Sequence, residues 1–275
     1  MINNEPRDII KKWYRRLNLP QKYDEDFYRA LNERADAVRA YDINEYDITE
    51  SDGIKNLFSA LYCCERLSEH YSERWIDEDI LLRTLSDIET SLESWYEIKG
   101  YLWLGSIRWL SGHLSGKLYR LGRLQFCLDK AMYDVPEIEM VKGENVISVH
   151  VQAGEPLKFE DCLTSFKQAV KFFEGYFPTF HYRHFICYSW LLDKELHKYL
   201  PMESNILKFA RQFEIYRQEP SDRIFNYVFK RGASRDDLPS VTSKTAFAET
   251  VKRAAIGGAV FYEGYGVIKK ERFEY

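Results

Sequence analysis

The stretch that decides the fold is residues 145–192, NVISVHVQAGEPLKFEDCLTSFKQAVKFFEGYFPTFHYRHFICYSWLL. Residues 145–152 alternate apolar and polar side chains and are rich in Val, which predicts a β-strand. Residues 160–177 carry apolar side chains at helical spacing, and residues 183–192 return to a strand pattern. The order strand, turn, helix, strand therefore predicts a β-sheet flanked by helices.

The sequence on both sides of this stretch extends the same pattern. Residues 117–127 (KLYRLGRLQFC) alternate in twos and predict a strand before it. After it, residues 194–213 predict a helix broken near Pro201, and residues 223–230 predict a strand. Residues 231–244, with Gly, Pro and Ser, predict a loop. Residues 245–255 predict a helix, and residues 259–268 predict a strand interrupted by glycines.

The first part of the chain has a helical pattern instead. Its amphipathic runs predict the four helices of a small bundle: residues 10–17, 24–39, 54–61 and 80–92. Ser51 or Asp52 can cap the third helix through a side-chain oxygen. Charge also divides unevenly, with a net charge of −8 over residues 1–95 and +4 over residues 96–275. We therefore predict an α+β fold with an N-terminal helical domain (1–98) and a sheet domain (99–275).

Composition excludes several classes of protein. The 275 residues are 45% hydrophobic, and their net charge of −4 argues against a general nucleic-acid binder. Five cysteines without a CxxC spacing fit neither a disulfide framework nor a zinc site, and the histidines show no metal-ligand spacing. No apolar run is long enough to be a signal peptide or membrane span. A cytoplasmic protein without a metal or a membrane partner is expected.

Three groups of residues are candidates for a functional role. His150 lies on the more polar face of its strand, where a neutral imidazole can act as a general base or serve only as a hydrogen-bonded structural residue. Cys187 shares a strand face with Ser189 and is either a reactive thiol or a small core residue; the second reading is favoured. The third group can bind a ligand or cap an element: Arg120, Arg123 and Gln125.

The turn before the second predicted helix is a candidate phosphate site. Free N–H groups at a helix start can bind phosphates, and Gly154 lies in this turn. However, neither GxxxxGK[ST] nor GxGxxG occurs, and the carboxylates of Glu160 and Asp161 would repel a phosphate. Nucleotide binding through those two motifs is therefore excluded.

Four strings in the chain carry a family resemblance: LYRLGRLQF (118–126), VHVQAGEPLKFEDCLTSFKQAVKFFEGYFP (149–178), HFICYSWLLDKELHKYLPMESNILKFARQF (184–213) and GGAVFYEGYGVI (257–268). They resemble a bacterial family of acyltransferases that joins an N-terminal helical domain to a C-terminal domain similar to the GNAT acyltransferases. The resemblance covers roughly residues 100–270 well and the helical part only in general layout.

The resemblance implies a mixed sheet that binds acyl-CoA or acetyl-CoA. The acyl group would pass to an amine-type acceptor, which attacks the thioester directly. The strand carrying Val149 and Val151 would pair with the pantetheine amides, and backbone N–H groups near Val151 would polarise the thioester oxygen. The helix start, with Gly154 and Lys158, would face the pyrophosphate.

The next strand would splay away to open the thioester pocket. His150 would act as the base, with Ser189 facing the same groove. The partners expected are a small-molecule acyl donor and acceptor, and the sequence leaves the oligomeric state open.

A rival function is a non-catalytic ligand-binding or interaction protein that keeps the GNAT-like frame. The sequence departs from the usual GNAT phosphate loop, because no Gly-x-Gly or Gly-x-Ala turn follows Gln152. This departure favours the rival.

Overall fold

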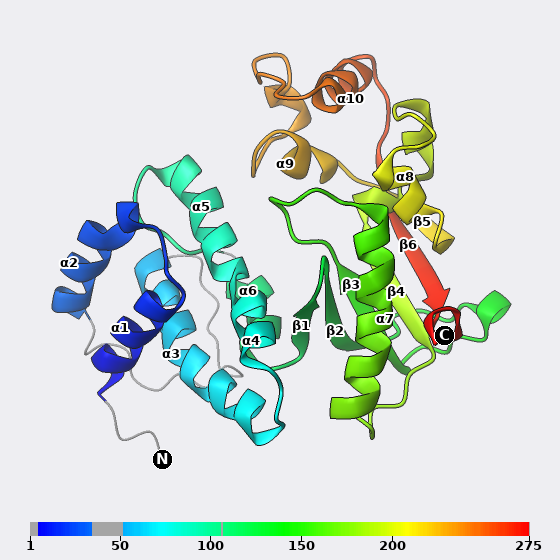
Figure 1. Ribbon diagram of the computed structural model, residues 1–275. Helices are drawn as coiled ribbons and strands as arrows, with labels where there is room; N and C mark the ends of the chain where they lie inside the picture. Colours follow the sequence, from blue (N-terminus) through cyan, green and yellow to red (C-terminus); the bar gives the residue numbers. More distant parts are fainter. Residues whose placement is uncertain (1–4, 35–51, 106, 275) are drawn as a thin grey trace. The chain divides into compact units, whose positions relative to one another are not determined.

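A computed structural model describes residues 5–34, 52–105 and 107–274 (Figure 1). They form two compact units, Met1–Arg120 and Leu121–Tyr275. The first is helical and the second holds most of a mixed sheet, which confirms the predicted α+β fold. The boundary expected at residues 98–99 falls at the end of α5 inside the first unit, because α6 packs against α3.

The helices of the first unit each bury one stripe of apolar side chains. They are α1 (Pro6–Arg16), α2 (Asp24–Arg34), α3 (Gly53–Glu73), α4 (Glu78–Leu85), α5 (Asp87–Lys99) and α6 (Ile107–Leu114). Asp52 caps α3 as predicted, since its side chain accepts a hydrogen bond from the Lys55 N–H at 3.0 Å. Ser51 and residues 35–39 of the second predicted helix lie outside the described residues.

The run at residues 80–92, predicted as one helix, belongs to two. The helical path breaks at Ser86, whose hydroxyl donates to the Arg83 carbonyl at 2.8 Å. A serine that bonds a nearby carbonyl in this way competes with the helical ladder.

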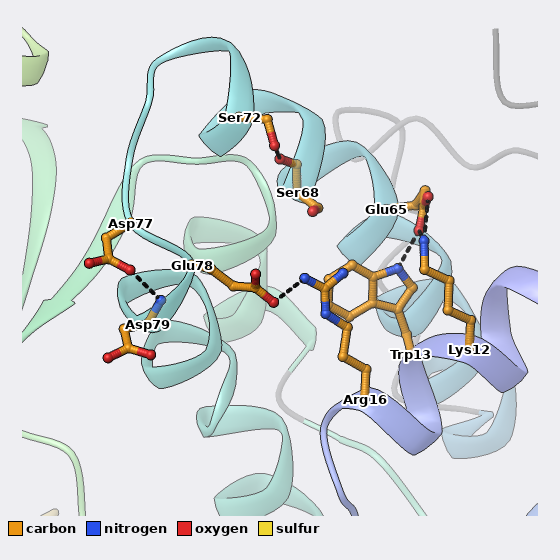
Figure 2. Close-up of polar contacts among 9 residues, drawn as sticks. All are labelled: Lys12, Trp13, Arg16, Glu65, Ser68, Ser72, Asp77, Glu78 and Asp79. Atoms are coloured by element: carbon orange, nitrogen blue, oxygen red, sulfur yellow. Dashed lines mark hydrogen bonds and ion pairs between the residues drawn. The ribbon is translucent and has the colours of Figure 1, made fainter.

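Polar contacts link α1 to α3 and α4, as Figure 2 shows. The buried Trp13 donates its indole N–H to Glu65 at 2.6 Å, and Lys12 lies 2.8 Å from the same carboxylate. The Arg16 guanidinium lies 4.5 Å from the Trp13 ring centroid and pairs with Glu78. Burial alone would raise the pKa of Glu65, but the hydrogen bonds from Lys12 and Trp13 lower it below its usual value.

The sheet has the order β1-β2-β3-β4-β6-β5. Its strands are β1 (Leu118–Leu121), β2 (Leu124–Lys130), β3 (Asn145–His150), β4 (His184–Ser189), β5 (Glu214–Pro220) and β6 (Tyr262–Lys269). β3 and β4 are parallel, while β2 pairs with β3, and β6 with both β4 and β5, in antiparallel fashion. The parallel pair needs a crossover, and helix α7 (Phe159–Tyr176) provides it.

Helix α7 covers one face of the sheet (Figure 1). Its buried Phe166 lies 5.6 Å from the Phe126 ring centroid on β2 and 5.2 Å from that of Phe185 on β4. The later helices are α8 (Asn205–Ala210), α9 (Ile224–Val228) and α10 (Ala246–Ile256). The positions of α8 and α10 agree with the predicted helix broken near Pro201 and the predicted helix at residues 245–255.

Two sequence-based assignments were wrong in this unit. Residues 117–127 contain a hairpin instead of one strand, because Gly122 turns the chain with φ +69° between β1 and β2. Residues 223–230, predicted as a strand, contain α9, which buries Ile224 and Phe225 in a cluster with Phe261. The strand β5, which pairs with β6, lies just before α9 and was not predicted.

Candidate active site

The parallel strands β3 and β4 part toward their C-terminal ends. Their register joins only Ile147 with Phe185 and Ser148 with Ile186. Both strands continue beyond these pairs, β3 alongside β2 as far as His150 and β4 alongside β6 as far as Ser189. Backbone groups on the facing sides of the two strands are therefore not used by the sheet ladder. The pairing therefore ends where the predicted splay would begin.

The register also fixes which side chains share a face. Since Ser148 lies beside Ile186, alternation places His150 and Tyr188 on that same face, one on each side of the opening. Ser189 alternates to the other face with Phe185, the face that α7 covers. His150 and Ser189, which we expected to face one groove, thus belong to opposite faces of the sheet.

His150 is half-buried at the end of β3. Its Nε2 lies 3.1 Å from the Oγ of the buried Ser148, and it stands opposite Gln125 of β2. A hydrogen bond to one ring nitrogen helps to fix the tautomer and orientation of an imidazole, which general-base catalysis requires.

Ser189 has a structural contact of its own. Its Oγ accepts the Leu191 N–H at 3.1 Å and caps the short 3₁₀ helix η5 (Trp190–Leu192). Helix η5 packs against β6, where a Cβ added to Gly264 would lie 2.5 Å from the Leu192 carbonyl oxygen. The glycines near the end of the sequence therefore allow close packing of η5.

The residues expected to meet the donor lie between β3 and α7. Val149 is buried within β3, and Val151 is half-buried just beyond it. Gly154 is exposed, with φ +92° and open space where a Cβ would be. The exposed Lys158 is the N-cap residue of α7 but makes no side-chain cap. The N–H groups of the first helical turn are thus left without a capping side chain from this residue.

The His150 face also carries a polar cluster that was not predicted from the sequence. The Tyr188 hydroxyl donates to Glu263 at 2.6 Å, and this buried carboxylate also accepts from Ser221 at 3.2 Å and Arg223 at 3.1 Å. Burial and the hydrogen bond to Glu263 raise the pKa of Tyr188. The alternation in RHFICYSWLL placed Tyr188 on its face, but nothing in the sequence linked it to Glu263 on a distant strand.

Cys162 and Cys187 are not activated nucleophiles. Burial raises the pKa of Cys187 to about 12 and that of Cys162 to about 12, so both thiols are protonated near neutral pH. Cys187 is only 3% exposed, which confirms the interpretation as a small core residue. Among the described residues, no group of three or more His, Cys, Asp or Glu side chains could hold a metal ion.

A capping serine and an aromatic cluster lie elsewhere in this unit. Ser204 caps α8 through the Leu207 N–H at 3.3 Å. The aromatic cluster at the end of α7, including Phe173, Phe177 and Tyr182, lines a cavity of about 220 Å³. Because Tyr182 precedes β4, this cavity lies at the opposite end of that strand from the opening. No helix within residues 5–34, 52–105 and 107–274 combines the length and apolarity needed to cross a membrane.

The parallel crossover, the mixed sheet and the diverging strands define a GNAT-like architecture. The chain belongs to the family described as GNAT-like C-terminal domain, which matches residues 118–268. Residues 4–116 match the N-acyltransferase N-terminal domain. The resemblance to a two-part acyltransferase family is thereby confirmed. No curated protein sequence matches the chain.

Solved structures share this fold over almost the whole chain. One is an acyltransferase in complex with decanoyl-CoA and teicoplanin, 21% identical with a TM-score of 0.74. Another is an acyltransferase in complex with decanoyl-CoA, 23% identical with a TM-score of 0.74. A third is an acyltransferase mutant in complex with octanoyl-CoA, 21% identical with a TM-score of 0.73. Each alignment covers 94% of this chain and 87% of the other.

Proposed function

We propose that the protein transfers an acyl group from acyl-CoA to an amine-type acceptor by direct attack. The observation that carries the proposal is the parting of β3 and β4 after Ser148 and Ile186. An extended pantetheine arm has amide groups that can pair with the strand backbone at Val149 and Val151, as a neighbouring strand would. Family membership and the acyl-CoA complexes of similarly folded acyltransferases support the same donor.

In this proposal each residue has a stated role. The amine nitrogen forms a bond to the thioester carbonyl carbon, and its proton passes to His150 directly or through a water. Backbone N–H groups near Val151 stabilise the oxyanion, after which the C–S bond breaks and CoA leaves with the sulfur. Gly154 and Lys158 lie beside the phosphates. Ser189 is the last residue of β4, and its hydroxyl oxygen accepts a hydrogen bond from the Leu191 N–H.

Direct attack needs no covalent intermediate on the enzyme, which agrees with the protonated state of Cys187. The five cysteines are free, which supports the cytoplasm as the proposed location.

Calorimetric titration with acetyl-CoA, octanoyl-CoA and decanoyl-CoA tests the donor. We expect saturable heat and a rise in Tm with at least one of them, because a ligand that binds only the folded state stabilises it. The absence of both effects with all three would refute the proposal.

A second function is favoured by the first turn of α7. Glu160 and Asp161 lie there, exposed, where the usual family turn offers glycines to phosphates. Carboxylates in place of these glycines are consistent with a GNAT-like binding protein that has no catalytic activity. It predicts acyl-CoA binding without release of CoA thiol when a panel of amines is added.

A further inference from the structure

Arg123 is a buried cation whose side chain holds the loop between β3 and α7. Its Nε donates to the Pro156 carbonyl at 2.9 Å, and its Nη2 donates to the carbonyls of Gln152 at 3.0 Å and Glu155 at 2.8 Å. The residue is only 7% exposed. The planar, multi-donor guanidinium is suited to several acceptors at fixed angles, whereas a lysine ammonium is a point charge on a flexible stem.

The backbone of Arg123 is fixed to the same helix that the loop leads into. Its N–H donates to the Ser165 Oγ at 2.8 Å, and that hydroxyl donates to the Asp161 carbonyl in α7 at 2.8 Å. Gly122 makes this approach possible, since a Cβ there would lie 2.7 Å from the Ser165 Oγ. The β1–β2 turn, the loop and the start of α7 thus form one connected unit.

The direction of the bound carbonyls determines the direction of the loop's N–H groups. In a trans peptide the C=O and the following N–H point in opposite directions. The Gln152 and Pro156 carbonyls point toward Arg123, so the N–H groups of Ala153 and Leu157 point away from it. No described residue accepts a hydrogen bond from either N–H, and Ala153 is exposed.

We propose that Arg123 is a positioning residue for the phosphates of the acyl donor. By holding three carbonyls beneath the loop, it keeps outward N–H groups beside the start of α7 and adds a positive charge behind them. It thereby replaces the glycine-rich turn that this chain lacks after Gln152. Outward N–H groups backed by a cation favour an anion. This inference rests on the proposed function, because it assumes that the donor is an acyl-CoA.

The test compares two donors that differ only in their phosphates. Decanoyl-CoA and decanoyl-pantetheine share the acyl chain and the amide arm, but decanoyl-pantetheine carries no phosphate. For Arg123→Lys we expect the Kd of decanoyl-CoA to rise about tenfold, while that of decanoyl-pantetheine changes less than about twofold. Arg183→Lys is the control, since Arg183 also donates to a backbone carbonyl, that of Glu139 at 2.8 Å, but lies just before β4. It should bind both donors like the unmodified protein.

The outcomes separate this inference from the proposed function. If the unmodified protein binds neither donor, both fall. If it binds both and Arg123→Lys weakens them equally, or weakens neither, only the role of Arg123 is refuted. Circular dichroism and Tm establish that each variant is folded. Should Arg123→Lys not fold, Ser165→Ala takes its place. It removes the acceptor for the Arg123 N–H, together with the bond from the hydroxyl to the Asp161 carbonyl, and should shift the two Kd values in the same unequal way.

Discussion

His150 lies two positions beyond Ser148, at the point where β3 leaves β4. We expect His150→Gln to reduce kcat by about a hundredfold or more, because the amide cannot accept a proton from the amine. The Kd of the acyl donor should not change, since the proposed function assigns donor binding to backbone groups. Steady-state kinetics with an amine acceptor, together with calorimetry, measure the two effects. Unaltered kcat would remove His150 from the mechanism.

Ser189 provides the matched comparison on the neighbouring strand. Its hydroxyl caps η5, so Ser189→Ala should lower the free energy of unfolding by about 0.5–2 kcal/mol, as loss of a helix cap does. We expect kcat to stay within about twofold, because catalytic effects of general bases are far larger. Urea denaturation and the same kinetic assay test both expectations. A large loss of kcat in a stable Ser189→Ala protein would assign chemistry to this hydroxyl.

Gly122 is restricted by both conformation and space. Its φ is +69°, and a Cβ would come within 2.7 Å of the Ser165 Oγ. Gly122→Ala should therefore cost at least about 1–2 kcal/mol of unfolding free energy. Gly143→Ala is the control: Gly143 also has positive φ, +88°, but open space around the added Cβ. Chemical denaturation should show the greater loss for Gly122→Ala, and equal losses would mean that the contact with Ser165 does not matter.

At the scale of elements, Glu65 joins α1 to α3 through a carboxylate with a lowered pKa. A lowered folded-state pKa stabilises the protein above the unfolded pKa, and this contribution is lost as pH falls through the folded value. Glu65→Gln should reduce the free energy of unfolding by about 1–3 kcal/mol near pH 7. The difference in free energy of unfolding between Glu65→Gln and the unmodified protein should become smaller below pH 4.5, the ordinary pKa of glutamate.

Denaturation curves at a series of pH values measure this narrowing. Glu69→Gln is the control, because Glu69 is exposed on the same helix, one turn away. A Glu65→Gln deficit that stays constant from neutral to acidic pH would contradict an ionic contribution from this carboxylate.

Elements with strong local patterns could be predicted, and those set by distant partners could not. The helix α7 and its flanking strands follow from apolar spacing in residues 145–192 alone. The strand β5 contains Glu214 and Arg217, and its pairing with β6 comes from a segment far along the chain. Ile224 and Phe225 suggested a strand. They lie in a helix instead, because both side chains pack into a buried cluster with Phe261.

The candidate site shows the same division between local and distant information. Alternation placed His150 on the polar face, as the register does. It could not show that Ser189 belongs to the other face, because a comparison across two strands needs their register. Nor could it show that Arg123 reaches carbonyls about thirty residues away in the chain, since those contacts depend on the turn at Gly122 and on α7.

At the scale of the whole molecule, the cysteines give a test of the direct mechanism. Cys63, Cys64, Cys162 and Cys187 are buried, and Cys127 is half-buried. Native protein should react with iodoacetamide at Cys127 alone, if at all, and the modification should leave the proposed acyl transfer activity unchanged. Mass spectrometry of the labelled protein and an activity assay measure both. Inactivation that follows modification of Cys187 would indicate a covalent route instead.

The parting of β3 and β4 has a consequence for the protein without its donor. It creates an edge in the interior of the sheet, because the backbone N–H and C=O groups of β3 and β4 beyond Ser148 and Ile186 do not pair with each other. Under the proposed function, the amides of the donor would pair with these strands, and the sheet would become continuous only with the donor bound. The donor in this view completes the secondary structure, so slower amide hydrogen exchange along both margins should accompany its arrival.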